Sequence, residues 1–182
     1  LLQVENVAEI VEEIRQMSDS EYKNHKIVHK AQMRSNEINH TTPSRGMSAF
    51  DFDETLIDKG ENFIIATKGD EVVRISSGQW PIQGPQLAED GYDFNFDDFI
   101  NVRGGIEGPL MQKFRNRIKK FGIENNYILT ARPAEAAPAI KAWLETQGID
   151  MPIENITGLG NSTGAAKAMW IAEKYSEGYN DI

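Results

Sequence analysis

The feature that most constrains the fold is a short apolar run that ends in two carboxylates, one residue apart. Met47, Ala49 and Phe50 lead into Asp51 and Asp53. A short apolar run of this kind is typical of a buried strand. In a parallel α/β sheet, ligands bind in the crevice beyond the strand ends. Two carboxylates placed there can divide labour, one ionised as nucleophile and metal ligand and the other carrying a proton. A plain acidic turn is the alternative interpretation.

Downstream of this motif, apolar strand-like runs alternate with amphipathic helical ones, joined by short links. Such alternation is the signature of a parallel sheet with right-handed crossovers. We therefore expect an α/β fold in which the strand before Asp51 lies next to the strand that ends at Thr130. The expected strands are 47–52, 127–130 and 153–157, and the expected helices are 109–121, 134–147 and a helix carrying Lys167 that is capped by Ser162 or Thr163.

An insert of about residues 60–108 separates the first two expected strands of this sheet. Residues 62–76 are expected to form a β-hairpin, with two β-rich runs around Lys68-Gly-Asp70. Residues 77–108 are rich in Gly, Pro and aromatic residues, and we expect them to be irregular. The insert is interpreted either as a small cap, which would exclude water and select substrate, or as a surface hairpin that protects a sheet edge.

Residues 1–45 are expected to form a helical appendage and linker outside a core of residues 46–182. Residues 3–15 carry an apolar stripe at helical spacing, and residues 20–39 form a weaker one. Pro43 and Gly46 would stop any helix. This appendage is the place where we expect a protein partner, if there is one, to bind.

Three motifs, in order along the chain, resemble those of the haloacid dehalogenase (HAD) superfamily. Asp51-Phe-Asp-Glu-Thr-Leu56 resembles the first motif. Tyr127-Ile-Leu-Thr-Ala-Arg-Pro133 resembles the second, with Thr130 at the phosphate-binding position, and Lys167 in the stretch 163–171 resembles the third. Members of this family are mostly magnesium-dependent phosphatases. The resemblance implies a Rossmannoid three-layer sandwich with a parallel sheet.

The resemblance also implies a role for each matching residue. Asp51 would be the phosphorylated nucleophile and Asp53 the general acid/base, and both would hold Mg²⁺. Thr130 and Lys167 would complete the catalytic set. The substrate-binding neighbours would be Thr55, Ala131 and Arg132. The expected substrate is a small phosphomonoester.

The fourth motif of that family, a strand ending in one or two Asp, is missing. The Lys167 helix is expected to end at Tyr175, and Asp181-Ile182 stands where that strand would begin. We therefore expect a fragment of a longer reading frame or a trimmed chain, with an open edge on the first strand, weak magnesium binding and little activity. Asp97 and Asp98 could supply carboxylates from the insert, although turn-capping or solvent-facing roles are commoner for such residues.

Composition narrows the function classes. The formal net charge is -9, which argues against a nonspecific nucleic-acid-binding surface, because that affinity comes largely from Lys and Arg. The absence of cysteine excludes disulfides and thiolate catalysis. No apolar run reaches the length of a membrane span and no signal peptide is recognisable, so we expect a cytoplasmic protein, in the host cytoplasm if it is viral.

A non-catalytic function is the alternative to an enzyme. The chain would then be a HAD-like binding or scaffold module of a larger, viral assembly. The insert sequence and the Leu-Thr-Ala-Arg strand resemble phage-encoded HAD-like proteins of unassigned role. Retention of Asp51, Asp53, Thr130 and Lys167 favours descent from an enzyme, because a fold alone does not demand these residues.

Overall fold

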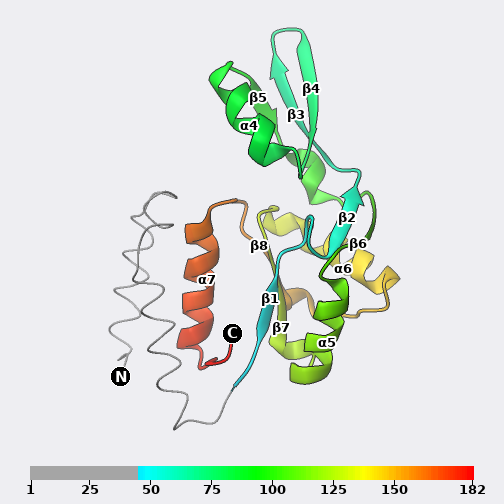
Figure 1. The fold of residues 1–182 in the computed structure, drawn as a ribbon, viewed down its shortest axis with the longest axis vertical. Helices are drawn as coiled ribbons and strands as arrows, with labels where there is room; N and C mark the ends of the chain where they lie inside the picture. Colours follow the sequence, from blue (N-terminus) through cyan, green and yellow to red (C-terminus); the bar gives the residue numbers. More distant parts are fainter. Residues whose placement is uncertain (1–44) are drawn as a thin grey trace. The chain divides into compact units, whose positions relative to one another are not determined.

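The computed structural model describes residues 45–182, so the expected helical appendage lies outside the described residues. The chain divides into two compact units. One unit comprises residues 50–160, and the described part of the other comprises residues 45–49 and 161–182. Figure 1 shows the elements of both units, each of which is described by itself below.

A small parallel sheet carries the strand ends that the sequence singled out. Its strands are β1 (Ser48–Phe50), β7 (Asn126–Thr130) and β8 (Ile156–Gly158), in the order β1-β7-β8. The predicted neighbourhood of the Asp51 and Thr130 strands is therefore confirmed, as is a mixed α/β fold. All five residues of β7 are buried, as expected for the central strand of a parallel sheet. The third strand starts later than predicted, because residues Ile153–Asn155 form a 3-10 turn, η4.

Two helices of the larger unit pack on one apolar core. They are α5 (Met111–Phe121) and α6 (Ala137–Thr146), with short 3-10 turns before β7 (η2, Ile123–Asn125) and before α6 (η3, Ala134–Ala136). In α5, buried Met111 and Phe114 and half-buried Ile118 recur every three or four residues, as the sequence predicted. Gly122, with φ of 83°, ends the helix. Edge-on aromatic contact joins Phe52 to Trp143 at 5.5 Å between ring centroids.

The insert contains the predicted hairpin and considerably more. Strands β3 (Phe63–Lys68) and β4 (Glu71–Ser76) pair antiparallel around Gly69, whose φ of 58° suits the turn. The prediction that residues 77–108 are irregular is wrong. They contain α4 (Trp80–Glu89), β5 (Asp93–Asn95) beside β3, the 3-10 turn η1 (Asp97–Ile100) and β6 (Gly104–Glu107), which pairs with β2 (Ile57–Gly60).

A separate apolar cluster explains why this segment folds. Ile64, Ala66, Ile75 and Phe99 are buried together, and the aromatic side chains of the supposedly irregular stretch, among them Trp80 and Phe94, pack against them. Pro81 occupies the first turn of α4, where a missing N–H costs no helical hydrogen bond. In this segment the proline marks the start of a helix and the aromatic residues form a small core, whereas the sequence analysis takes both as signs of a loop. Figure 1 shows β3, β4, β5 and α4 gathered into one body, with β2 and β6 forming its stem.

The other unit contains α7 (Gly164–Ser176) and the chain on either side of the larger unit. The Thr163 hydroxyl accepts a hydrogen bond from the Ala166 amide at 3.2 Å, so the predicted N-cap is confirmed. After α7 the chain lies beside the residues that precede β1. The Met47 amide donates to the Asp181 carbonyl at 2.8 Å within a parallel bridge. The start of the first strand is thus paired at this point, where we expected an open edge.

A substitution at Gly158 tests how closely β8 packs against the loop after β7. A Cβ at Gly158 would lie 2.3 Å from the Pro133 carbonyl oxygen, whereas a Cβ at Gly60 would have no neighbour within 4 Å. We expect Gly158→Ala to destabilise the protein by about 1–3 kcal/mol, the usual cost of overpacking a tight site. Gly60→Ala, also in a strand and free of left-handed backbone, is the control and should change stability little. Urea unfolding at constant m-value measures both. If the two variants unfold at the same urea concentration, the loop after β7 moves to accommodate the added methyl group at little cost, and the prediction is wrong.

Candidate functional site

The loop after β1 is anchored on both sides of its acidic residues. Phe52 and Leu56 are fully buried, while Asp51 and Asp53 are partly accessible. The Phe52 carbonyl accepts hydrogen bonds from the amides of three residues of the next turn, at 2.9–3.3 Å. The Phe52 amide donates to the Asp51 carboxylate at 2.8 Å. Apolar anchors therefore hold a tight turn in place, and its two carboxylates extend from the strand end.

The loops after β7 and β8 are hydrogen-bonded to one another. The Leu159 amide donates to the Thr130 carbonyl at 2.9 Å, and the Gly160 amide donates to the Arg132 carbonyl at 3.0 Å. Thr130 is almost completely buried, and its hydroxyl accepts a hydrogen bond from the Arg132 amide at 3.2 Å. Because β1 and β7 are neighbours in a parallel sheet, the Asp51 loop and the Thr130 loop leave the same edge of that sheet.

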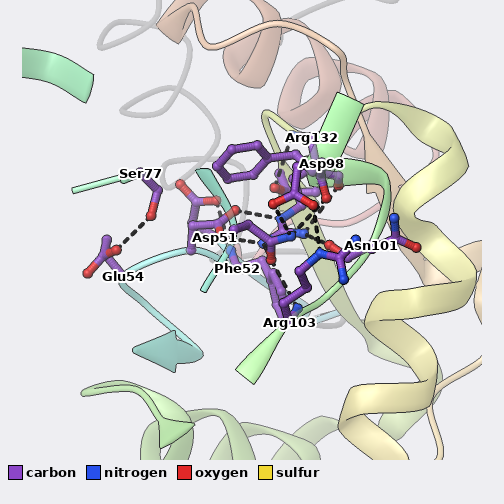
Figure 2. Close-up of polar contacts among 12 residues, drawn as sticks. Asp51, Phe52, Glu54, Ser77, Asp98, Asn101, Arg103 and Arg132 are labelled. Carbon is purple, nitrogen blue, oxygen red and sulfur yellow. Dashed lines mark hydrogen bonds and ion pairs between the residues drawn. The ribbon is translucent and has the colours of Figure 1, made fainter. Parts of the chain in front are cut away.

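Arg132 occupies the centre of the site. Its Nε and Nη2 donate to the two carboxylate oxygens of Asp53 at 2.9 and 2.8 Å. Nη2 also donates to Asn62 Oδ1 at 3.2 Å, and Nη1 donates to the carbonyls of Phe99 and Asn101 at 3.2 and 2.5 Å. A guanidinium has five N–H donors, and these five hydrogen bonds match that number. Figure 2 shows Arg132 at the centre of these contacts.

The ion pair between Arg132 and Asp53 is largely shielded from water. The Arg132 side chain is 2% exposed and the Asp53 side chain 22%. The guanidinium also lies over the rings of Phe52 and Phe99, at 5.2 and 5.0 Å from the centroids. A charge buried this deeply is tolerated only when it is paired and its hydrogen bonds are satisfied. Arg132 therefore joins three segments, the Asp53 loop, the start of β3 and the η1 turn.

Sequence reasoning missed Asn62 altogether. Asn62 is buried at the start of the hairpin; it donates through Nδ2 to the Asp98 carbonyl at 2.8 Å and accepts through Oδ1 from the Arg103 amide at 3.1 Å. No motif marked this residue. The one available signal was an amide side chain just before a β-rich run, which is a common and uninformative pattern.

Asp98 has a structural position in the insert. Its carboxylate accepts hydrogen bonds from the Phe63 amide at 3.0 Å and from Arg103 Nε at 2.7 Å. Burial acts to raise the pKa of Asp98, but the hydrogen bonds from Arg103, Phe63 and Asn62 together outweigh it and hold the pKa below its ordinary value. Within residues 45–182, no three His, Cys, Asp or Glu side chains are grouped as metal ligands. The suggestion that Asp97 and Asp98 complete a metal site therefore finds no support.

A second contact joins the Asp51–Asp53 loop to the insert. The Ser77 hydroxyl, just before α4, donates to Glu54 Oε1 at 2.7 Å. Glu54 itself has a φ of 55°, a left-handed conformation that side chains other than Gly, Asn and Asp seldom adopt. The loop is therefore fastened to the insert at Glu54 as well as through Asp53 and Arg132, and Figure 2 draws both contacts.

The remaining predicted site residues divide between the two units. Thr55 and Ala131 are half-buried and lie in the same unit as Asp51, Asp53 and Thr130. Lys167 is in the first turn of α7, in the other unit, so the structure does not place it relative to Asp51. The larger unit thus contains all of the predicted site residues except Lys167.

Comparison with known proteins found no matching family model, no similar curated protein and no similar solved structure. In the part of the chain from residue 45 onward, no helix has both the length and the apolarity to cross a membrane.

The low pKa of Asp98 predicts how stability responds to acid. Its pKa is below the value of an unfolded Asp, about 3.9. The stabilisation it provides is therefore complete above about pH 4 and is lost as pH falls through the folded pKa. We expect Asp98→Asn to be less stable than the wild type at pH 7. Its free energy of unfolding should also fall less steeply between pH 5 and about 3. Urea midpoints across that range measure this. Arg103→Gln, which removes a donor but keeps the carboxylate, should bring the folded pKa closer to the unfolded one and so make the acid-induced loss of stability smaller. An unchanged profile in both variants would contradict this assignment.

Proposed function

We propose that this chain is a HAD-type, magnesium-dependent phosphatase that hydrolyses a small phosphomonoester through an aspartyl phosphate. The observation that carries the proposal is the meeting of two strand ends. Asp51 and Asp53 follow β1, and Thr130 ends the neighbouring parallel strand β7. A phosphoryl group held between these loops would have a nucleophile on one side and a hydroxyl on the other, as covalent phosphoryl transfer needs.

In this mechanism the Asp51 carboxylate attacks phosphorus in line with the leaving oxygen. The P–O bond to the alcohol breaks as the Asp51–phosphorus ester forms, and Asp53 gives its proton to the departing alcohol oxygen. Asp53, now a carboxylate, takes a proton from water, which attacks the phosphorus, releases inorganic phosphate and restores Asp51. The Thr130 hydroxyl and backbone amides of the Asp51 loop would stabilise the charge on the phosphoryl oxygens.

The Arg132 ion pair leaves Asp53 able to do this chemistry. A carboxylate has about four lone-pair positions, and the two hydrogen bonds from Arg132 occupy one on each oxygen. Each oxygen of Asp53 therefore keeps a lone pair that Arg132 does not use. Arg132 was predicted to contact the substrate, but its donors are taken up inside the protein, and contact with Asp53 is the role these hydrogen bonds favour.

The donor set around Asp51 fits magnesium only in part. Mg²⁺ prefers oxygen ligands in near-octahedral geometry and keeps several of its waters. The Asp51 carboxylate and the Asp53 carbonyl would hold it, since the Asp53 carboxylate is engaged by Arg132. Bound there, the ion would neutralise charge on the phosphoryl oxygens.

The folded insert favours the cap interpretation over a simple edge-protecting hairpin. It has its own apolar cluster, and it is fastened to the Asp51–Asp53 loop through Arg132 and through the Ser77–Glu54 hydrogen bond. A body fixed in this way beside the site would restrict water and shape the space for substrate. We propose that substrate selection resides in the insert.

A non-catalytic binding or scaffold module is the second candidate, and one observation favours it. Both oxygens of Asp53 are committed to a buried guanidinium, so this Asp would be retained for structure even without catalysis. Phosphatase activity that depends on Asp51 separates the two candidates, because Asp51 has no part in that ion pair.

The test of the proposed function is Asp51→Asn, assayed with p-nitrophenyl phosphate and Mg²⁺. An amide is a poor nucleophile, so we expect kcat/KM to fall by several orders of magnitude. Asp150→Asn is the matched control: Asp150 lies before η4, away from the loops after β1 and β7, its side chain is 85% exposed, and its contact is an ion pair with Lys141. It should retain full activity. Wild-type protein without magnesium-dependent phosphate release, or Asp51→Asn that keeps most of it, would overturn the proposal.

A further inference from the structure

The hydrogen bonds of Arg132 divide between two parts of the larger unit. Two go to the Asp53 carboxylate, in the loop after β1. The other three go to the insert, namely to the Asn62 side chain and to the carbonyls of Phe99 and Asn101. Asp53 supplies the charge that balances the guanidinium, while the insert supplies uncharged oxygen acceptors. Neither part alone satisfies the buried guanidinium.

The insert holds its acceptors in fixed positions. Asn62 Nδ2 donates to the carbonyl and carboxylate of Asp98, and Asn62 Oδ1 accepts from the Arg103 amide. These contacts fix which way the Asn62 amide faces, with its oxygen toward Arg132. The carbonyls of Phe99 and Asn101 belong to or adjoin the η1 turn, whose Phe99 side chain is buried in the insert's own apolar cluster. The acceptors are therefore correctly placed only when the insert is folded and seated.

We propose that Arg132 is a positioning residue that couples the seating of the insert to the placement of the Asp53 carboxylate. The proposal rests on the proposed function for the role of Asp53 as general acid and base. When the insert is seated, the guanidinium fixes both oxygens of Asp53 in one orientation. When the insert is displaced, three donors of a buried cation lose their partners, and the guanidinium must turn toward water and release its hold on Asp53.

This coupling makes proton donation conditional on the insert. A chain whose substrate-selecting insert is unseated would keep the Asp51 nucleophile but lose the orientation of its acid. Esters whose leaving groups need a proton would then not be hydrolysed. The Ser77–Glu54 hydrogen bond is a second contact that keeps the insert near the loop. Arg132 thus acts through Asp53 and not by touching the substrate.

Leaving-group dependence tests the coupling. Glycerol phosphate has a poor alcohol leaving group that needs protonation, whereas p-nitrophenyl phosphate has a good one. General acid catalysis contributes about 10²–10⁴-fold. Arg132→Lys keeps the positive charge but loses the planar, two-pronged donor geometry of the guanidinium. We expect it to lower kcat on glycerol phosphate by about 100-fold or more, and on p-nitrophenyl phosphate by less than about 10-fold. Asn62→Ala, which removes a single acceptor, should shift the ratio in the same direction by a smaller factor.

Arg103→Gln is the matched control. The Arg103 side chain contacts Asp98 and takes no part in the five hydrogen bonds of Arg132, so its replacement removes a charged contact inside the insert and leaves those five hydrogen bonds in place. It should lower the two rates by similar factors. Equal losses on both substrates in Arg132→Lys and in Asn62→Ala would reduce Arg132 to a structural residue and overturn the proposal.

Amide hydrogen exchange tests the same coupling without activity. Asp53→Asn and Arg132→Lys should each speed exchange at residues 61–63 and 99–103 while leaving β8 protected. If neither variant changes exchange in the insert, the coupling is absent and the proposal fails. Wild-type protein that shows the exchange coupling but hydrolyses neither ester would instead overturn the proposed function, and with it the catalytic role given to Asp53. The two failures are therefore distinguishable.

Discussion

The larger unit depends on one buried cation. Arg132 has a side chain that is 2% exposed and an ionic partner, Asp53, that retains partial access to water. Removing one partner of such a pair typically costs about 3–5 kcal/mol, because the other charge is left buried and unpaired. That cost is comparable to much of the net stability of a typical domain. The loop after β1, the loop after β7 and two segments of the insert consequently all meet at the Arg132 side chain.

The sheet explains why these segments can meet at one point. In a parallel arrangement the loops that follow neighbouring strands leave the same edge, so Asp53 after β1 and Arg132 after β7 are brought into range by the order β1-β7-β8. The loops are then held tightly enough that a side chain at Gly158 would collide with backbone. Ion pairing at the centre and close backbone packing beside it together leave this part of the site little freedom to rearrange.

Sequence reasoning was accurate where periodicity and end signals agreed. The parallel strands, the neighbourhood of β1 and β7, the α5 and α7 helices and one of the two candidate caps of α7, Thr163, all followed from apolar spacing and capping residues. It failed in the insert, where Gly, Pro and aromatic content was interpreted as irregular. Pro81 begins a helix there, and the aromatic residues form a small core. Composition alone cannot distinguish a loop from a short helix whose apolar face packs on a nearby sheet, because the partner surface comes from distant residues.

The site shows the same limit. Motif spacing located Asp51, Asp53 and Thr130, because each follows a strand that periodicity can identify. The family resemblance places Arg132 among the substrate-binding residues, and that assignment stays a prediction. The partners of Arg132, Asp53 and Asn62, lie 79 and 70 residues away in sequence, and nothing local indicates that a guanidinium will be used up before any ligand arrives. The charge balance among buried groups, which only the three-dimensional arrangement reveals, decides whether a cation faces solvent or the interior of the protein. Here Asp53 balances the charge of the Arg132 guanidinium, and the insert supplies its remaining acceptors.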